Sequence, residues 1–496
     1  MITHIKFPLK ANQLESLIKS QFTNNSADDL VFSIYTHQNK KIAVFGITYM
    51  LDMTMLGESL LAPLLSHQEA WTTETVLNEI PLSNGTTTNR MQDILDQLPL
   101  GNVFLYIEDE AEIVTYPINT EQQRSLEISE TESVIVGPHL AFTDSLRTNL
   151  NLVRQLIPTS DLVIEKFMVG NKTPREVRML YMKSVANDTD VDTLRQRIEE
   201  LDVDEIEDNT VLKQFLEDSA RSLFPQFYLT ELVNRLVYTL KQGKIGVMAE
   251  NSPSAFIAPS SFFSFFETSE DTYTRWLEAS AIRVLRMFAM LIALFVTPFY
   301  VALVTYQYQI IPTDLIVSIG QSRASVPFPP VIEALLIELM IELLREAGAR
   351  LPTKIGQTMG IVGGIVIGQA AVDAGITSNV LIIVVAMSAL ASFTTPSYTM
   401  GTSFRIIRFP MIVLAGLYGI IGVMFGTCLL LIHVLKMKSL GRPYLAPLYP
   451  IRLQDFNRVF FRTPPDKNSK RASLYRPKDR EQFSKEDASQ KRDIEQ

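Results

Sequence analysis

The run MFAMLIALFVTPFYVALVTY, residues 287–306, decides the class of this protein. It holds 20 residues without a charge, about the length of helix that spans a hydrocarbon core of ~30 Å. Arg283 and Arg286 stand directly before it, and basic flanks favour the cytoplasmic side of a membrane. The run therefore predicts a membrane-spanning helix whose preceding chain is cytoplasmic.

Further apolar segments follow at 327–344, 355–375, 380–393 and 409–435. Five crossings would place the tail outside, although residues 436–496 hold 15 Lys and Arg against 8 Asp and Glu. An even number of crossings removes this conflict, because it places the basic tail on the same side as the head. We favour four, with the segment at 327–344 partial or interfacial, because it carries three glutamates and begins with three prolines in four residues. Short basic loops, Arg350 with Lys354 and Arg405 with Arg408, fit five crossings better.

The chain before residue 280 has the composition of a soluble acidic protein. Runs such as LVFSIY (30–35) and KIAVFGI (41–47) predict strands, whereas DSLRTNLNLVRQLI (144–157) and LTELVNRLVYTLKQG (229–243) predict helices. The predicted fold class is an α/β cytoplasmic head of two subdomains followed by an α-helical multi-pass membrane domain. The expected domains are the first subdomain at 1–137, the second at 138–280, a membrane domain of four to five apolar helices at 281–437, and a basic cytoplasmic tail at 438–496, largely disordered after about 463.

The head carries no catalytic signature. Its histidines never approach metal-ligand spacing, and there is no G-x-S-x-G, P-loop or G-x-G-x-x-G motif. The single cysteine, Cys428, excludes an intrachain disulfide, and the first residues lack the apolar region of a cleavable signal peptide. We expect no enzymatic activity, no catalytic residue, no cofactor or metal, and no nucleic-acid partner.

Glycines recur every four residues in the segment 355–375, although glycine costs a helix about 1 kcal/mol relative to alanine. This spacing removes side chains from one helix face, so that another helix can approach closely. The predicted packing residues are Gly356, Gly360, Gly364 and Gly368, with Gly422 and Gly426 in the last segment. The packing is either within one subunit or between copies around an axis. In the second case a pore is lined by Val362 and Val366, with Thr358 and Gln369 near its ends.

Glu338, Glu342 and Glu346 form one acidic stripe on the segment that begins at 327. One interpretation is the polar face of an interfacial helix, with Glu346 paired to Arg350. The other is a band of negative charge that attracts cations to a pore mouth when subunits form a ring.

The stretch SVPFPPVIEALLIELMIELLREAGARLPTKIGQTMGIVGGIVIGQAAVDAGITSN (325–379) resembles the signature of the A subunits of bacterial spore germinant receptors of the GerA type, including Pro327, Phe328 and Pro329. Similar blocks bring the resemblance to residues 137–450. Residues 244–259 depart from the glycine-rich turn that this family more usually has at this place.

The resemblance implies an integral protein of the spore inner membrane with cytoplasmic head and tail. It also implies a transporter-like B subunit and a lipoprotein C subunit as partners. An oligomeric, nutrient-gated cation channel fits both the resemblance and the glycine and glutamate patterns. The alternatives are a secondary transporter and a membrane-anchored signalling scaffold without a pore.

Overall fold

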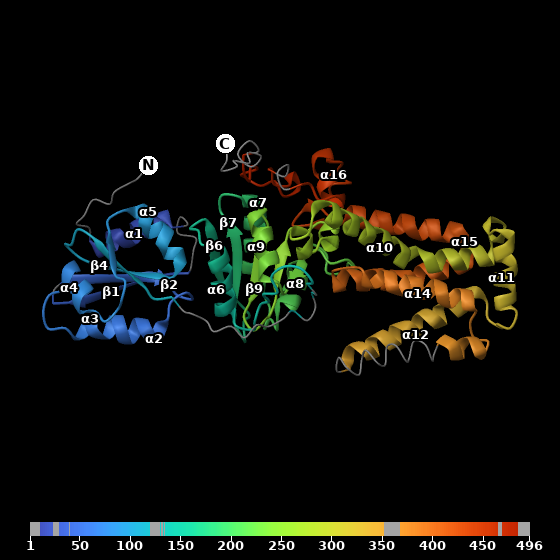
Figure 1. Cartoon of the computed structure of the whole chain (residues 1–496), viewed down its shortest axis with the longest axis horizontal. Helices are drawn as coiled ribbons and strands as arrows, with labels where there is room; N and C mark the ends of the chain where they lie inside the picture. Colours follow the sequence, from blue (N-terminus) through green and yellow to red (C-terminus); the bar gives the residue numbers. More distant parts are fainter. Residues whose placement is uncertain are drawn as a thin grey trace, which may run out of the picture. The chain divides into compact units, whose positions relative to one another are not determined.

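The computed structural model describes residues 10–22, 29–38, 40–119, 129, 132, 134–351, 368–464 and 469–484. The chain divides into two compact units. Unit 1 comprises Met1–Ala220, Phe227–Ser260 and Pro465–Gln496, and unit 2 comprises Arg221–Gln226 and Ser261–Pro464. Unit 1 is α/β and unit 2 is mainly helical (Figure 1), which is the predicted order. The long segment of unit 2 begins at Ser261, whereas the membrane domain was predicted to begin at residue 281.

The first subdomain is one antiparallel sheet covered by helices. Its strand order is β1-β2-β4-β5-β3, and helices lie on both faces of the sheet (Figure 1). Its elements are α1 (Ala11–Gln21), β1 (Leu30–His37), β2 (Lys40–Ile47), α2 (Met53–Met55), the π-helix η2 (Leu56–Leu61), α3 (Ala62–Ser66), α4 (Thr73–Glu79), β3 (Thr86–Thr88), α5 (Met91–Gln97), η3 (Leu98–Leu100), β4 (Asn102–Ile107) and β5 (Ile113–Pro117).

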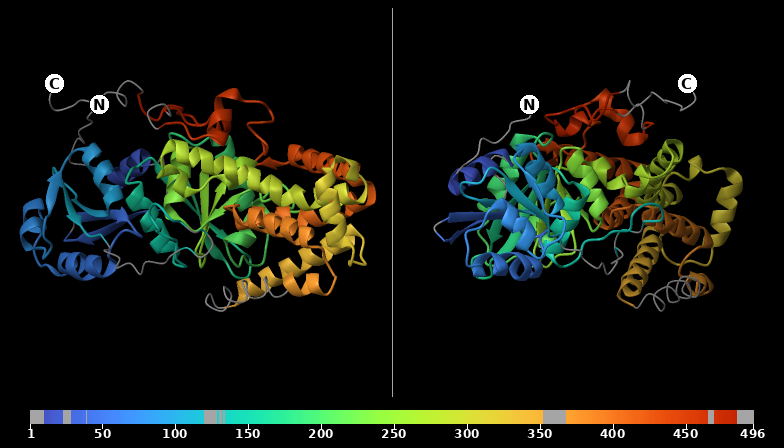
Figure 2. Two further views of the ribbon diagram at one scale, coloured as in Figure 1. Left: turned by 45° about the vertical axis from the view of Figure 1, so that its right-hand side comes forward. Right: turned by 60° about the vertical axis from the view of Figure 1, so that its left-hand side comes forward.

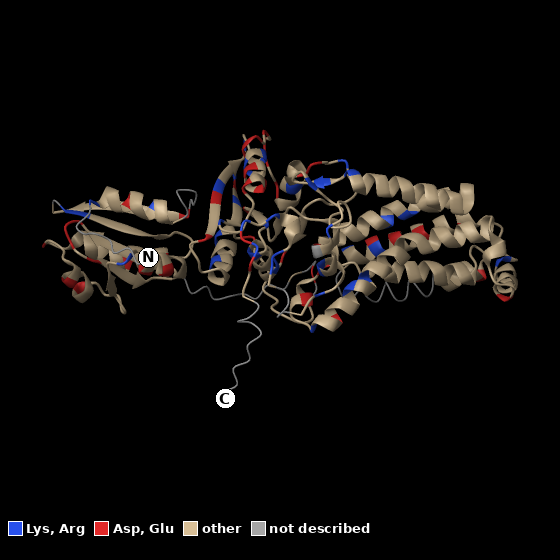
Figure 3. Cartoon of the chain, turned by 90° about the horizontal axis from the view of Figure 1, so that it is seen from above, with Lys and Arg blue, Asp and Glu red and all other residues tan. Residues whose placement is uncertain are grey.

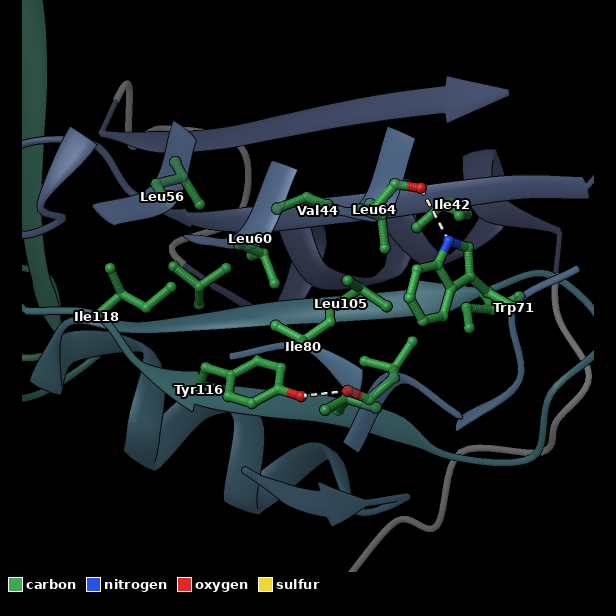
Figure 4. Packing of buried hydrophobic residues seen from close by; sticks show 14 of the residues in the cluster. Ile42, Val44, Leu56, Leu60, Leu64, Trp71, Ile80, Leu105, Tyr116 and Ile118 are labelled. Atoms are coloured by element: carbon green, nitrogen blue, oxygen red, sulfur yellow. Dashed lines mark hydrogen bonds between the residues drawn. The ribbon is translucent and has the colours of Figure 1, made fainter. Parts of the chain in front are cut away.

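Alternation along the strands builds the core of this subdomain, because every second side chain of a strand points to the same face. Buried residues of β2, β4 and β5 pack against Leu60, Leu64 and Trp71 (Figure 4). The indole of Trp71 donates to the Leu64 carbonyl at 2.8 Å, and the Tyr116 hydroxyl donates to the Val76 carbonyl at 2.9 Å. Both buried aromatic polar groups are thus satisfied.

The second subdomain repeats the topology of the first. Its antiparallel sheet has the order β6-β7-β9-β10-β8, and in both subdomains the sequence runs helix, two strands, helices, strand, helix, two strands. Its elements are α6 (Leu146–Leu156), β6 (Leu162–Val169), β7 (Arg175–Met182), α7 (Asp188–Glu199), α8 (Asn209–Leu216), β8 (Tyr228–Thr230), α9 (Val233–Lys241), β9 (Ile245–Ala249) and β10 (Ala255–Ala258).

The predicted helix at 229–243 is wrong at its start. Residues Tyr228–Thr230 form β8, which pairs with β10, and α9 begins only at Val233. The pairing with a strand 25 residues further along the chain outweighs the local helical pattern, an effect that periodicity cannot reveal.

A buried ion pair joins the two subdomains of unit 1. Arg154 of α6 binds Asp29, which precedes β1, and neither side chain is exposed to solvent. The other guanidinium N–H groups of Arg154 donate to the Tyr49 hydroxyl and to the carbonyls of Thr159 and Leu162 at 3.1–3.2 Å. Burial raises the pKa of the Tyr49 phenol, which therefore stays protonated and donates to Asp29.

Part of the C-terminal tail is folded against the second subdomain, contrary to the expectation of disorder after about 463. Arg471 donates to the Lys241 carbonyl at the end of α9, and Lys478 lies 2.5 Å from the Asp188 carboxylate. The ring of Tyr475 is buried, with the Lys244 ammonium 4.3 Å from its centroid. Each of these contacts is made by one side chain, so the mainly polar composition of the tail could not predict them.

Unit 2 is built on long helices. Figures 1 and 2 show α10, α14 and α15 side by side. The helices are α10 (Trp276–Thr305), α11 (Thr313–Arg323), α12 (Pro330–Arg350), α14 (Asn379–Phe393), α15 (Tyr398–Lys436) and α16 (Leu453–Phe460), with short 3-10 turns η4 (Phe262–Phe266), η5 (Ser269–Thr272), η6 (Tyr308–Ile310) and η8 (Ser473–Tyr475, in unit 1), and a small hairpin, β11 (Lys438–Ser439) and β12 (Arg442–Pro443).

Among the described residues, α10 and α15 are long and apolar enough to cross a membrane. The run at 287–306 falls almost entirely within α10.

The last apolar segment, 409–435, is not one continuous helix. Gly419, inside α15, has φ +62° and ψ −142°, which breaks the helix. The ring of Phe224 lies 5.5 Å from Phe404 and 6.1 Å from His433, residues that a straight helix would hold about 40 Å apart. The two arms, 398–418 and 420–436, therefore fold back on each other as a hairpin.

The helix α12 is continuous over 21 residues, and its expected partial or interfacial placement in the membrane stays a prediction. It runs parallel to α14. Glu333, near the start of α12, contacts Ser378 at the start of α14, and Arg345, near the end of α12, contacts Ser392 near the end of α14. The starts of the two helices therefore lie at the same end of the pair.

Candidate functional site

The acidic residues of α12 form the most unusual chemical feature of unit 2. Figure 3 shows long uncharged stretches on the helices of this unit, so the few charged positions stand out. A charged group among apolar helices is expensive unless it is paired, and such groups mark functional sites more often than structural ones.

Glu338 is bound by two neighbouring helices. It accepts hydrogen bonds from Arg408 of α15 at 2.7 Å and from the Thr297 hydroxyl of α10 at 2.9 Å. Both members of the ion pair are 1% exposed. One carboxylate thus connects α10, α12 and the first arm of α15.

Glu333 is completely buried one and a half turns earlier on α12. One carboxylate oxygen accepts from the Ser378 backbone N–H at 2.7 Å and the Thr377 hydroxyl at 3.1 Å, and the other lies 2.9 Å from Arg323 of α11. The start of a helix favours a negative charge because its first N–H groups have no partner within the helix. Glu333 therefore fixes the start of α14 against α12.

The remaining glutamates of the predicted stripe also have arginine partners. Glu342 lies 3.1 Å from Arg345 and 3.5 Å from Arg405, and Glu346 lies 2.6 Å from Arg350 in an exposed pair. The pairing of Glu346 with Arg350 is the one that the interfacial-helix interpretation expected. The attraction of cations by the stripe stays a prediction.

Arg408 is held by fewer bonds than its burial would suggest. Its Nη1 group donates to Glu338, whereas its Nε and Nη2 groups are buried and, in the described part of the chain, have no hydrogen-bond partner. The Nε group of Arg345 is in the same condition. Buried N–H groups without an acceptor are destabilising, so this pairing lies well above the lowest energy that a guanidinium can reach in a protein.

The break at Gly419 is stabilised by the end of α10. The Ile420 N–H, freed by the break, donates to the side-chain oxygen of Gln307 at 3.3 Å, and the Tyr306 hydroxyl donates to the Leu417 carbonyl at 3.0 Å. These two bonds attach the bend of the hairpin to the residues at the end of α10.

The glycines of the second arm pack within the chain. A Cβ on Gly422 would lie 2.0 Å from the Leu414 carbonyl oxygen, and one on Gly426 would lie 2.4 Å from the Met411 sulfur. Both neighbours belong to the first arm. The close approach predicted from small residues four apart is present here, between two arms of one hairpin.

Other predicted residues are placed only in part. Gly356, Gly360, Gly364, Thr358, Val362 and Val366 lie outside the described residues. A Cβ on Gly368 would meet no atom within 4 Å, and Gln369 is exposed and donates to Asp373 at 3.0 Å. The signature residues Pro327, Phe328 and Pro329 form the turn before α12, where the Phe328 carbonyl accepts from Arg323.

Sequence reasoning missed Arg408 and Arg323 as partners of the acidic helix. Arg405 and Arg408 were expected in a short basic loop, which is wrong: both lie inside α15 and are largely buried. The available signal was their spacing of three, which puts both on one helix face opposite glutamates spaced by four on α12.

The arginines before the apolar run have a structural partner. Asp271, which is 3% exposed, accepts from Arg283 at 2.9 Å and from Arg286 at 3.0 Å. Burial acts to raise the pKa of Asp271, but the two guanidinium groups outweigh it and leave the pKa lowered. The carboxylate therefore anchors the first turns of α10 in its charged form.

Comparisons with known proteins agree with one another. A sequence profile described as Bacillus/Clostridium GerA spore germination protein matches residues 16–474. The spore germination protein GerQA of Bacillus cereus is 39% identical over 468 residues, covering 94% of this chain and 93% of that protein. The uncharacterized membrane protein YfkQ of Bacillus subtilis is 34% identical over 461 residues, covering 92% and 90%. The crystal structure of the N-terminal domain of the A subunit of the Bacillus megaterium spore germinant receptor GerK3 aligns with a TM-score of 0.41 at 24% identity, covering 53% of this chain and 98% of that one.

Proposed function

The chain belongs to the GerA spore germination protein family, and from this premise we propose that it is the A subunit of a germinant receptor in the spore inner membrane. Copies of its helical unit form a cation channel that opens in response to a nutrient. The observation that carries the channel proposal is the buried pair of Glu338 and Arg408, which connects three helices in an otherwise apolar unit.

The proposal follows from the chemistry of that pair. Charged side chains within apolar helices are associated with ion pathways and with elements that move. The Nε and Nη2 groups of Arg408 have no acceptor among the described residues, so an arrangement of α12 and α15 that supplied acceptors would gain hydrogen bonds. A nutrient signal that favours this second arrangement would shift the helices around the pore.

The proposed topology has an even number of passes. α10, α12, α14 and the two arms of α15 account for five, and the apolar segment at 355–375, expected from the sequence to cross, makes six. This replaces the four passes inferred from the sequence. The head and the tail then lie on one side, the cytoplasmic side, together with Arg350 and Lys436.

The proposed partners are a transporter-like B subunit, a lipoprotein C subunit and further copies of the chain, with membrane lipid around the helices. A scaffold without a pore is the second candidate. It is favoured by the pairing of Glu338, Glu342 and Glu346 with arginines of the same chain, which leaves little uncompensated negative charge to attract cations.

Potassium release from spores separates the two candidates. A channel predicts that Val362→Ser or Val366→Ser, which widens and wets the proposed constriction, releases potassium without nutrient. Both positions lie outside the described residues, so this test follows from the sequence pattern. Val413→Ser, at an exposed position of the first arm, is the control.

The outcomes are distinct. Spores that assemble normal amounts of both variants and release no potassium without nutrient would contradict the channel and favour the scaffold. Gly364→Leu should block close helix approach and abolish assembly. Nutrient uptake by the chain alone would favour a secondary transporter.

A further inference from the structure

The segment after the last arm of α15 presents exposed apolar residues in an unusual density. Leu448, Tyr449, Ile451 and Leu453 are 37%, 58%, 75% and 79% exposed. With Pro450, they occupy five of six successive positions that end in the first residue of α16. We call residues 448–453 the apolar tip. An exposed apolar cluster of this kind marks a surface that contacts another phase or another molecule.

The stretch of sequence around the tip is strongly basic. Between residues 436 and 462 the chain has Lys436, Lys438, Arg442, Arg452, Arg458 and Arg462, whereas its one acidic residue, Asp455, is buried. Lys436 and Lys438 are exposed. The partner that suits this surface is therefore apolar in its interior and negatively charged at its boundary.

Hydrogen bonds hold the end of α16, the helix into which the tip leads, against the first turns of α10. Arg283 donates to the Arg458 carbonyl at 2.8 Å, and the Arg462 N–H donates to the Ser280 hydroxyl at 2.9 Å. The rings of Phe263 and Phe460 are 5.5 Å apart. Figures 1 and 2 show α16 projecting to the side near the start of α10.

This level coincides with the border of the apolar run. Arg283 precedes Met287, the first residue of the run, by four residues, or about 6 Å along the helix. The headgroup region of a bilayer extends about 5–8 Å beyond the hydrocarbon core. The end of α16 therefore lies at the depth of lipid headgroups if α10 crosses the membrane as proposed, and the tip leads into the same eight-residue helix.

We propose that residues 448–461 form a contact with the surface of an anionic phospholipid bilayer. Tyr449, Ile451 and Leu453 enter the boundary between headgroups and acyl chains, and the exposed Lys436 and Lys438 lie near the phosphates. Because Arg283 and Ser280 hold the segment on α10, the contact sets how deep the start of that helix sits. The inference rests on the proposed membrane location and is independent of whether the chain forms a pore.

The test uses the full chain in lipid vesicles that contain a spin-labelled lipid as quencher. Cys428 is the single cysteine, so Cys428→Ser provides a background for one label at a time. An NBD fluorophore is attached at Ile451→Cys. Leu431→Cys, on the second arm, reports membrane placement, and Met168→Cys, a similarly exposed residue of β6, reports a position on the head.

We expect the label at 451 to be quenched by shallow spin-labelled lipid, and about twofold more strongly when phosphatidylglycerol replaces a third of the phosphatidylcholine. Lys436→Glu with Lys438→Glu should remove this dependence on anionic lipid. Lys172→Glu, an exposed lysine of the head, should leave it unchanged.

Quenching at 431 without quenching at 451 would overturn the contact and leave the membrane location standing. Absence of quenching at both positions would overturn both. Self-quenching at 451 that rises with the ratio of protein to lipid would show that a second copy covers the tip, which also contradicts the proposal.

Discussion

Two buried ion pairs, one in each unit, show how the same chemistry is used in opposite ways. Arg154 and Asp29 in unit 1 are both inaccessible to solvent, and each nitrogen of the guanidinium has an oxygen acceptor. Arg408 and Glu338 in unit 2 are equally buried, yet only one nitrogen of Arg408 has an acceptor within the described residues.

The difference indicates how firmly each pair holds its surroundings. In the first pair every nitrogen of Arg154 has an acceptor, although the Oδ1 atom of Asp29 has no partner among the described residues, and the bonds that are made fix the two subdomains of the head to each other. A guanidinium with unused donors gains energy from any arrangement that supplies acceptors. The helices around Arg408 are therefore the part of the chain in which we expect movement.

The largest expected effect is that of Arg154→Met. It leaves Asp29 charged and buried without its partner, and should lower the free energy of unfolding of the head by about 3–5 kcal/mol. Hydrogen exchange of α6 and β2 amides in the full chain measures this loss. Adding Asp29→Leu should restore more than half of it, since no unpaired charge remains. If the double variant is as unstable as the single one, the pair is not the cause.

Arg408→Met should cost less, about 2 kcal/mol, because it also removes two unsatisfied donors. Exchange in α12 and in the first arm of α15 is the measurement, with Glu338→Met added as the partner control. A loss equal to or greater than that of Arg154→Met would remove the distinction between a satisfied and a half-satisfied pair.

Gly419→Ala tests whether the hairpin that carries Arg408 depends on its break. The positive φ of Gly419 strains any other residue, and a Cβ would lie 2.6 Å from the Gln307 side-chain oxygen. We expect a loss of about 1–2 kcal/mol in thermal unfolding of the purified chain. Gly348→Ala in α12, where a Cβ meets nothing within 4 Å, should show no loss. A stable Gly419→Ala variant would mean that the break is incidental.

The pair of Asp271 with Arg283 and Arg286 should respond to pH. Because the folded pKa of Asp271 lies below its unfolded value, its stabilisation is complete above the unfolded pKa and is lost as pH falls through the folded one. In a Trp71→Phe background, the fluorescence of Trp276 at the start of α10 reports the change. Asp271→Asn should remove this transition. A transition that persists in the variant would assign it to other groups.

The smallest effect is expected for Glu346→Gln. Its pair with Arg350 is 58% and 79% exposed, and exposed pairs of this kind contribute about 0–0.5 kcal/mol. Thermal unfolding of the purified chain should hardly change. A large loss of stability would show that other groups cover the pair in the native assembly. The comparison of buried ion pairs would then also apply to Glu346, at the surface of the unit.

The local sequence pattern was sufficient to predict much of the secondary structure of the head and the helix α10. The strands β1 and β2 and the helix α6 appear where alternation and helical spacing predict them. The partners of the acidic helix could not be predicted, because Arg323 and Arg408 lie far from it in the sequence. The spacing of Gly422 and Gly426 predicted close packing, but the packing partner became visible only with the break at Gly419.

The sequence by itself determined the division into an α/β head and an apolar helical domain, because periodicity and hydropathy are properties of short stretches of chain. It also carried the family resemblance. Tertiary structure alone decided that the last helix folds back at Gly419, that the two sheets share one topology, and that Arg408 reaches Glu338 with two of its three nitrogens unpaired among the described residues. These features arise from contacts between segments distant in the sequence, where packing and electrostatics outweigh local preference.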